Sequence, residues 1–312
     1  MSRKGWVLFA IMCVVWGIPY LLIKVAVGEV AVPVVVFTRT ALGAVVLIPL
    51  ALRSGSGHLG TLRRHWRPLV AFAALEMIVP WGLLSQAERN LPSSLAGLLI
   101  AAVPIISVVV AKLTGGTERL SARRWTGLII GLAGVAVLAA PDLSGGRGWP
   151  ITEVLLVAVG YASAPLIAAR RLGDVPALPM TVACLSLAAL VYTPAAILAW
   201  PHRMPSAQVL AALAALGIVC TACAFIVFLQ LIREVGTSRA MVFTYVNPAV
   251  AVAAGVVVLS EPFTATMAAS FALILTGCLL ATGQQRSAVE PPADTVTGPV
   301  LEAGDNPLES QR

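Results

Sequence analysis

The chain has 312 residues, of which 59% are hydrophobic and only 11% charged, and its mean hydropathy is +0.92. Soluble proteins carry about 25% charged residues on average, so this composition excludes an ordinary soluble domain. The net charge of +7 does not indicate nucleic-acid binding, because the basic residues lie in short connections between apolar runs.

Ten apolar runs are long enough to cross a bilayer as helices, since about 20 residues rising about 1.5 Å each span a hydrocarbon core of about 30 Å. The runs are continuous rather than alternating, which favours helices over a barrel. The first run follows Ser2-Arg3-Lys4 and lacks a convincing cleavage site, so we interpret it as an uncleaved span. The predicted spans are 5–25, 31–52, 68–87, 92–112, 122–141, 151–169, 177–200, 206–231, 237–259 and 263–283.

Basic residues are concentrated in alternate connections. Only Arg89, Arg147 and Arg203 occur in the connections of the other set. Cytoplasmic loops carry the excess of Lys and Arg, so this asymmetry predicts a cytoplasmic (inner) membrane protein with both termini in the cytoplasm. The residues expected inside are Arg3, Lys4, Arg53, Arg63, Arg64, Arg67, Lys112, Arg119, Arg123, Arg124, Arg170, Arg171, Arg233, Arg239, Arg286 and Arg312.

An internal repeat relates the two halves of the chain. Five spans per half is an odd number, so the second half enters the membrane upside down, as in many secondary transporters whose substrate site lies near the midplane. The sequence therefore predicts an all-α membrane protein with ten transmembrane helices in two inverted five-helix repeats, over 1–141 and 142–283. The matched pairs are Gln86–Gln230, Arg89–Arg233, Ser94–Ser238, Ala96–Ala240 and Pro104–Pro248 at a spacing of 144 residues; Glu118–Glu261 and Gly134–Gly277 at 143; and Pro19–Pro165, Lys24–Arg170 and Pro33–Pro179 at 146.

From Gln284 to Arg312 the composition changes to Pro, Glu, Asp, Ser and Gly, with few large apolar residues. Such a segment cannot bury enough apolar surface to fold, so we expect a disordered cytoplasmic tail over 284–312.

Three ionisable residues within the predicted spans stand out as candidates, since charges in a membrane are costly and are functional-site hypotheses. Arg39 and Glu76 reach similar depths from opposite sides of the membrane. We expect them to approach each other or to share a polar cavity, either as a static ion pair or as groups that handle substrate or protons. Glu76 is alternatively a neutral, protonated carboxyl that titrates during transport. Lys24 lies near the outer end of its span and either snorkels to the interface or takes part in function.

Prolines and polar or aromatic residues form a second set of candidates. Pro104 and Pro248 occupy matched repeat positions and predict bends that line a central cavity, because each proline frees a backbone carbonyl. Tyr245 and Asn247 lie beside Pro248 and offer hydrogen bonds. Flat rings in such a cavity suit an apolar or cationic substrate, and the candidates are Trp16, Tyr20, Trp81 and Tyr161.

The stretch from Thr237 to Leu280 resembles the second half-repeat of EamA-type transporters of the drug/metabolite transporter superfamily. A proline-bearing span is followed by Leu259-Ser260-Glu261, with serine where that family usually has glycine, and then by a span containing Gly277. Trp16-Gly17 followed by Lys24 is similar to the family's first helix, and Arg39 matches the arginine of its second. The resemblance implies a carrier that moves amino acids, related metabolites or drugs, most often out of the cell. It also implies that the last helix of each half is peripheral and could mediate dimerisation.

The predicted function is secondary-active transport by alternating access, of export type, with protons as a coupling ion and with a small-molecule substrate and the lipid bilayer as partners. The same fold would also serve an uptake carrier. A phosphate-binding G-x-x-x-x-G-K-[ST] loop is missing from the sequence, which argues against direct ATP drive. A membrane-embedded lipid-modifying enzyme is disfavoured because the three histidines are scattered in loops, and the repeat disfavours a non-transporting scaffold. We expect no enzyme activity, cofactor, metal or nucleic acid, and the sequence leaves substrate, direction and oligomeric state open.

Overall fold

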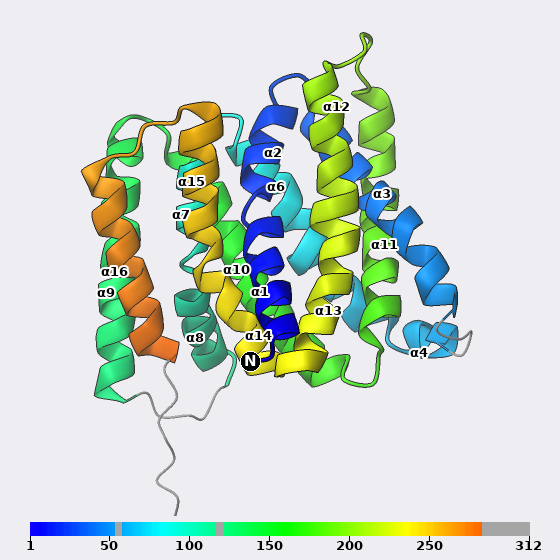
Figure 1. The fold of residues 1–312 in the computed structure, drawn as a ribbon, viewed down its shortest axis with the longest axis horizontal. Helices are drawn as coiled ribbons and strands as arrows, with labels where there is room; N and C mark the ends of the chain where they lie inside the picture. The colour runs from blue at the N-terminus through cyan, green and yellow to red at the C-terminus, as the bar shows by residue number, and fades with distance from the viewer. Residues whose placement is uncertain (54–57, 116–120, 283–312) are drawn as a thin grey trace, which may run out of the picture.

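A computed structural model of the chain describes residues 1–53, 58–115 and 121–282. Within these ranges every regular element is a helix and none is a strand (Figure 1). The predictions for Glu118 and for the tail over 284–312 concern residues outside the described ones.

In the first half of the chain, five spans correspond to helices broken at three places. The elements are α1 (Arg3–Val15), α2 (Pro19–Ala26), α3 (Val32–Arg53), α4 (His58–Arg64), α5 (Trp66–Ala73), the π-helical η1 (Ala74–Ile78), α6 (Val79–Ala87), α7 (Ser93–Ile100), α8 (Val103–Leu113) and α9 (Ala122–Ser144). Only α4 does not belong to a predicted span; it is a short helix between α3 and α5.

The second half repeats this order with different breaks. Its elements are α10 (Gly148–Arg171), α11 (Ala177–Leu198), α12 (Ala207–Ala214), the π-helical η2 (Ala215–Cys223), α13 (Ala224–Val235), α14 (Thr237–Ala240), the 3₁₀-helical η3 (Met241–Tyr245), α15 (Asn247–Leu259) and α16 (Ala265–Thr282). In the described residues, nine helical stretches are long and apolar enough to cross a membrane, and Asn247–Leu259 is a shorter apolar helix. These ten stretches confirm the predicted ten-helix class.

The helices run between two faces of the bundle. We call the face that holds the start of α1 the proximal face and the opposite one the distal face (Figure 1). The first half begins at the proximal face, whereas α10, which opens the second half, begins at the distal face. The two five-helix halves therefore have opposite directions across the bundle, as the odd number of spans predicts.

Prolines begin the later segment of three of the broken spans. Pro19, Pro104 and Pro248 each occupy the first or second position of a helix, where the missing N–H costs no hydrogen bond. The matched pair Pro104 and Pro248 thus marks a real discontinuity in both halves. Pro165, the repeat partner of Pro19, instead lies inside the unbroken α10, so the two halves differ at this point.

The last helices of the two halves, α9 and α16, pack against each other along one edge of the bundle (Figure 1). Glycines allow this approach. A Cβ at Gly127 would meet the backbone nitrogen of Ala281 at 2.5 Å, and a Cβ at Gly277 would meet the Cα and nitrogen of Gly131 at 2.5 Å. The sequence pattern Gly127-x-x-x-Gly131 in the fifth span predicts a close helix contact. The structure confirms this contact, and its partner is α16 of the same chain.

Gly277→Ala should destabilise the protein, because the added methyl group meets backbone and only a shift of the helices can accommodate it. Overpacking of this kind costs about 1–3 kcal/mol. Thermal unfolding in detergent should show a lower melting temperature for Gly277→Ala. Gly60→Ala is the matched control, since no atom lies within 4 Å of the added carbon; equal melting temperatures for the two variants would contradict the glycine contact.

Candidate functional site

Arg39 lies at the centre of the bundle, on α3, and only 7% of it is exposed. Its guanidinium carbon lies 3.6 Å from the centroid of the Trp81 ring, which belongs to α6. Its Nε donates a hydrogen bond of 3.1 Å to Oγ1 of Thr221, in η2 of the second half. The cation is thus held by the face of an aromatic ring and by one hydroxyl, and it joins the two halves.

Small residues bring α3 close enough to η2 for this contact. A Cβ at Gly217 would meet the Cβ of Leu42 at 2.6 Å, and a Cβ at Gly43 would meet Cγ2 of Thr221 at 2.8 Å. The Thr221 hydroxyl also donates to the carbonyl of Leu216 at 2.8 Å, inside the π-helical segment. Its oxygen is therefore held in place to accept from Arg39.

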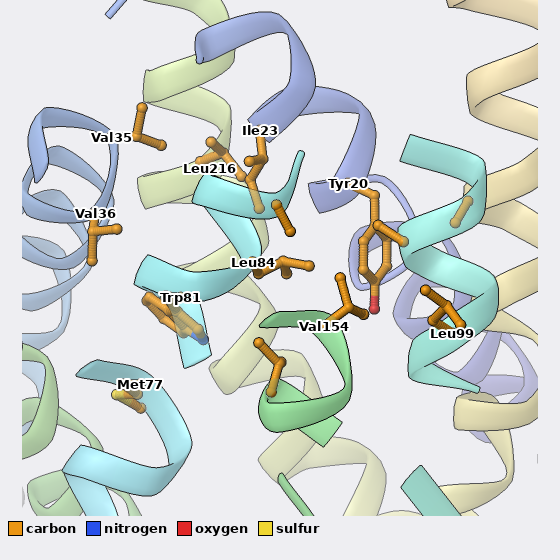
Figure 2. Close-up of a cluster of buried hydrophobic side chains, with 14 of the residues drawn as sticks. Tyr20, Ile23, Val35, Val36, Met77, Trp81, Leu84, Leu99, Val154 and Leu216 are labelled. Carbon is orange, nitrogen blue, oxygen red and sulfur yellow. The ribbon is translucent and has the colours of Figure 1, made fainter. Parts of the chain in front are cut away.

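Two tyrosines lie around this cation. The Tyr161 side chain, on α10, is an electrostatic neighbour of both Arg39 and Glu76 and a hydrogen-bonding neighbour of Trp81. Tyr20, on α2, is buried, and its hydroxyl lies near Leu99 and Val154 (Figure 2). The structure thus gathers four of the predicted cavity residues, Tyr20, Arg39, Trp81 and Tyr161, in one region.

Glu76 does not form the ion pair considered from the sequence. Among the described residues no salt bridge joins Glu76 to Arg39, whose partners are Trp81 and Thr221. Glu76 lies half-buried in η1, the π-helical segment of the third span. The two groups share Tyr161 as a neighbour instead of contacting each other.

Trp16 packs away from Arg39. Its ring centroid lies 5.7 Å from that of Phe225, 5.1 Å from that of Phe228 and 5.2 Å from that of Phe243. These phenylalanines belong to α13 and η3, so Trp16 takes part in an aromatic cluster between the first span and the second half. A wall of the central cavity remains a prediction for Trp16, and packing is the contact that the structure shows.

The residues beside Pro248 satisfy backbone groups near the helix breaks. When the amide of Asn247 is oriented with its nitrogen toward the neighbouring carbonyls, it donates to those of Phe243 at 3.1 Å and Cys13 at 3.2 Å. The Cys13 carbonyl is free because the N–H of Gly17 bonds to Val14 at the break between α1 and α2. The Tyr245 hydroxyl lies 2.6 Å from Oγ1 of Thr282.

Lys24 is part of a second polar constellation, at the distal face. Its Nζ donates to the carbonyls of Glu88 at 2.6 Å and Leu91 at 2.8 Å, where α6 ends. A cation at the C-terminal end of a helix meets unpaired carbonyls and the negative end of the helix dipole. Lys24 therefore stabilises the chain reversal between α6 and α7.

Glu261 holds the other side of the same reversal. Its Oε1 accepts from the backbone N–H of Ser93 at 2.7 Å, and its Oε2 accepts from that of Ser94 at 2.9 Å, at the start of α7. We call Lys24, Glu261 and the backbone of residues 88–94 the distal clamp. A carboxylate at a helix N-terminus is stabilised by the dipole and by charge-assisted hydrogen bonds.

The sequence Leu259-Ser260-Glu261 places this carboxylate. Ser260 adopts a left-handed conformation with φ of 54°, which reverses the chain after α15. The N–H of Glu261 then bonds to the carbonyl of Gly255 at 3.2 Å. A side chain at Gly255 would overlap the Glu261 carboxylate and Oγ of Ser93, so the glycine leaves room for the clamp.

Ionisation of Glu261 is favoured by this geometry. Burial opposes the charge, but the hydrogen bonds from Ser94 and Ser93 outweigh it and hold the pKa of Glu261 below its usual value. A lowered pKa contributes stability that is present above the ordinary carboxyl value of about 4.3 and is lost as the pH falls through the lower folded value. The distal clamp is therefore charged at neutral pH.

Among the described residues, which leave out Glu118, the repeat partner of Glu261, the helix packing of the distal clamp is not repeated at the proximal face. At the 144-residue spacing, α7 corresponds to residues 237–244, and α8 corresponds to the first part of α15. At the distal face α7 packs tightly on α15, whereas no comparable packing joins 237–244 to α8 in the described part of the chain. Arg170, the repeat partner of Lys24, has Nη2 3.4 Å from the carbonyl of Thr114. Within residues 1–53, 58–115 and 121–282, the packed and clamped pair of segments lies at the distal face.

Sequence reasoning missed several residues of this region. Thr221 and Tyr192 look like ordinary residues of apolar spans, yet Tyr192 donates from its hydroxyl to the carbonyl of Ile78 at 2.8 Å. Glu88 follows the third span directly and is adjacent to Arg89, so it resembles a loop residue, but it is fully buried. The spacing of charges along the chain does not reveal which loop residues turn inward.

Family comparison agrees with the fold. Residues 3–140 and 148–283 each match the model of the EamA-like transporter family. The chain belongs to this family and is a multi-pass membrane transporter. The resemblance seen at Trp16, Lys24, Arg39 and Leu259-Ser260-Glu261 is therefore confirmed at the level of the family.

Three relatives are informative. The chain is 26% identical over 253 residues to the uncharacterized inner membrane transporter YedA of Escherichia coli K12, covering 78% of each protein. It is 25% identical to the uncharacterized transporter YvbV of Bacillus subtilis 168, covering 88% of this chain and 90% of YvbV. It is 26% identical to a probable terminal-alkyne amino-acid exporter of Streptantibioticus cattleyicolor, covering 84% of this chain and 87% of that protein.

A solved crystal structure has the same fold, with a TM-score of 0.65. The alignment covers 90% of this chain and 98% of that one at 23% sequence identity. At this identity the likeness concerns the fold alone.

Glu261→Gln should loosen the distal clamp. The neutral amide has one acceptor oxygen in place of two and removes charge-assisted bonds that contribute about 1.5–3 kcal/mol each. We expect amide exchange at Ser93 and Ser94 to rise by about tenfold or more, since 1.4 kcal/mol corresponds to a factor of ten. Hydrogen-exchange mass spectrometry in lipid nanodiscs measures this change.

Glu29→Gln is the matched control for that variant. Glu29 also lies at the distal face, where its Oε2 accepts from the N–H of Ser206 at 2.7 Å, away from α7. It should leave exchange at Ser93 and Ser94 unchanged. Equal exchange in Glu261→Gln and the wild type would show that the carboxylate does not hold α7.

Proposed function

We propose that the protein is a secondary-active carrier that exports small organic solutes, such as amino acids, related metabolites or drugs, by alternating access. The observation that carries this proposal is the buried cation of Arg39, held between the two halves by Trp81 and Thr221. No carboxylate of the described residues forms an ion pair with Arg39. A substrate carboxylate would supply the missing anion, since the fork of a guanidinium suits a carboxylate.

The name of one relative supports amino acids as the substrate class. A protein of similar length and 26% identity is named as a probable amino-acid exporter. Amino acids carry the carboxylate that Arg39 would bind, and the faces of Trp81 and Tyr161 would contact the rest of the solute. Pro104 and Pro248, with Tyr245 and Asn247, form the breaks on which the halves would rearrange. We also propose that residues 1–141 and 142–283 are the two repeats.

We propose that the protein lies in the cytoplasmic (inner) cell membrane. Its proximal face and both termini are then on the cytoplasmic side. Support comes from the basic connections and from a polar cleft of about 530 Å³ on this face, lined by Arg64, His65, Arg170 and Arg171 among others. The distal face is then external. The distal clamp is closed, and residues 237–244 are not packed on α8 in the described part of the chain. The structure therefore represents a state closed to the outside.

An uptake carrier is the second candidate, because the same clamp and central cation would serve either direction. The fold does not choose between them. An enzyme is disfavoured, because the family is one of transporters.

Cells that overexpress the protein should lose one class of carboxylate-bearing solute, as measured by untargeted comparison of metabolites inside and outside the cells. Arg39→Ala should abolish this difference, because it removes the anion-binding group. Arg89→Ala, which removes an exposed arginine, is the matched control and should export like the wild type. Accumulation inside the cells would support uptake, and no change in either compartment would contradict transport of this kind.

Proton coupling through Glu76 predicts a specific pH effect. A half-buried carboxyl beside Tyr161 could bind a proton in one state and release it in the other. Glu76→Gln cannot ionise, so export driven by a pH gradient should fall at least about tenfold, while exchange of labelled solute without a gradient should persist. Unchanged gradient-driven export in Glu76→Gln would exclude Glu76 as the coupling group.

A further inference from the structure

Glu88 is the most unusual buried group outside the central region. The residue has no exposed surface, and neither carboxyl oxygen has a hydrogen-bond partner. Its own backbone carbonyl accepts from Lys24, so the side chain lies within the distal clamp. The hydroxyls of Ser93 and Ser94 in the same clamp are also buried without partners.

A charged carboxylate does not fit this environment. Burial of an ion without hydrogen bonds is costly, and such a group takes up a proton instead. The Glu261 carboxylate, already held by Ser93 and Ser94, would repel a second negative charge. The geometry therefore matches a neutral, protonated Glu88 in this conformation.

Positive groups near Glu88 are already occupied. The Lys24 ammonium donates hydrogen bonds to the backbone carbonyls of Glu88 and Leu91. Among the described residues it forms no ion pair with the carboxyl group of Glu88 or Glu261. Arg39 is held by Trp81 and Thr221. The titratable and charged groups that influence Glu88 from the surrounding elements are Lys24 and Tyr20 on α2, Arg39 on α3, Tyr161 on α10 and Glu261 after α15.

The repeat shows that a carboxyl is not needed to build this corner. At the spacing of 144 residues, the partner of Glu88 is Ile232, which lies at the end of α13. An apolar side chain thus fills the corresponding position of the second half. A buried acid at one face only points to a role in that face rather than in the frame of the helices.

We propose that Glu88 is a proton-binding site that controls the distal clamp: its protonated form keeps the distal face closed, and loss of the proton opens it. When the proton leaves to water at the distal face, the new carboxylate repels Glu261 and attracts the Lys24 ammonium. Lys24 then releases the carbonyls of Glu88 and Leu91, and the reversal between α6 and α7 separates from α15. Proton binding from the distal side reverses these steps.

This inference deepens the proposed function, since it assigns the ion that closes one gate of an alternating-access carrier. It also differs from the proposal for Glu76, which concerns the central region. Protonation of Glu88 would favour the state closed to the outside, so a more acidic exterior would drive an empty carrier toward the cytoplasm-facing state. An exporter coupled to proton entry requires this order of steps: the proton binds from outside, and the empty carrier then turns to the cytoplasm.

Hydrogen-exchange mass spectrometry of the full-length protein in lipid nanodiscs tests the proposal without a substrate. Exchange in peptides covering residues 88–100 and 247–264 is followed from about pH 6 to about pH 9, the range in which buried carboxyls titrate. Rates are corrected with the intrinsic exchange of the denatured peptides. In the wild type the corrected rates should rise at least about tenfold with pH, because ionised Glu88 opens the clamp.

Glu88→Gln keeps the shape of the protonated acid and cannot ionise. Its corrected rates should stay low and independent of pH. Glu153→Gln, which alters another buried carboxyl on α10, is the matched control and should show the pH response of the wild type.

The outcomes separate this inference from the transport proposal. A pH-independent wild type, or a Glu88→Gln variant that keeps the response, overturns the role of Glu88. Either result leaves the metabolite measurement with Arg39→Ala unaffected. A normal gate response in a protein that moves no solute would instead overturn the proposed function and leave the proton site standing.

Discussion

A broken helix in a bilayer exposes backbone groups that water cannot reach, and the rest of this structure depends on how those groups are satisfied. At the three breaks of the first half, a partner comes from the second half of the chain. The donor and acceptor pairs are Asn247 with the carbonyl of Cys13, Tyr192 with that of Ile78, and Cys278 with that of Ala101 at 3.3 Å. Breaks that permit motion are thus also the contacts that join the two repeats.

Electrostatics distinguishes the two faces. At the distal face a cation and a carboxylate meet opposite ends of adjoining helices, so each charge is stabilised by backbone groups and dipoles. In the part of the chain that the structure describes, no comparable packing joins residues 237–244 to α8 at the proximal face. Because the two halves are similar but not identical, one set of contacts can form while the other is open, which is the physical requirement for alternating access.

The central region has a different character from the clamp. Arg39 is buried, yet its partners are an aromatic face and one hydroxyl rather than an acid. Such a cation retains capacity for an anionic ligand, whereas Lys24 and Glu261 have theirs filled by backbone. The relatives are about a quarter identical to this chain in sequence. Which solute is carried depends on local side chains rather than on the frame.

The sequence by itself determined the number of spans, their inverted relation and the family. Each rests on long apolar runs or on residues repeated at constant spacing, which are properties of the chain rather than of contacts. It also indicated Pro104 and Pro248 as breaks and Gly127 with Gly131 as a packing face. Prolines and glycines act on the backbone locally, so their effects can be read in order along the chain.

Only the tertiary structure decided which side chains meet. Arg39 and Glu76 have similar depths, but depth does not determine the direction in which a side chain points from its helix. The Arg39 side chain contacts Trp81 and Thr221 instead of Glu76. Trp16 turned to three phenylalanines of the second half. Glu88 follows the end of a span and was indistinguishable from a loop acid, because its burial depends on α2 and on the loop after α15, which are distant in sequence.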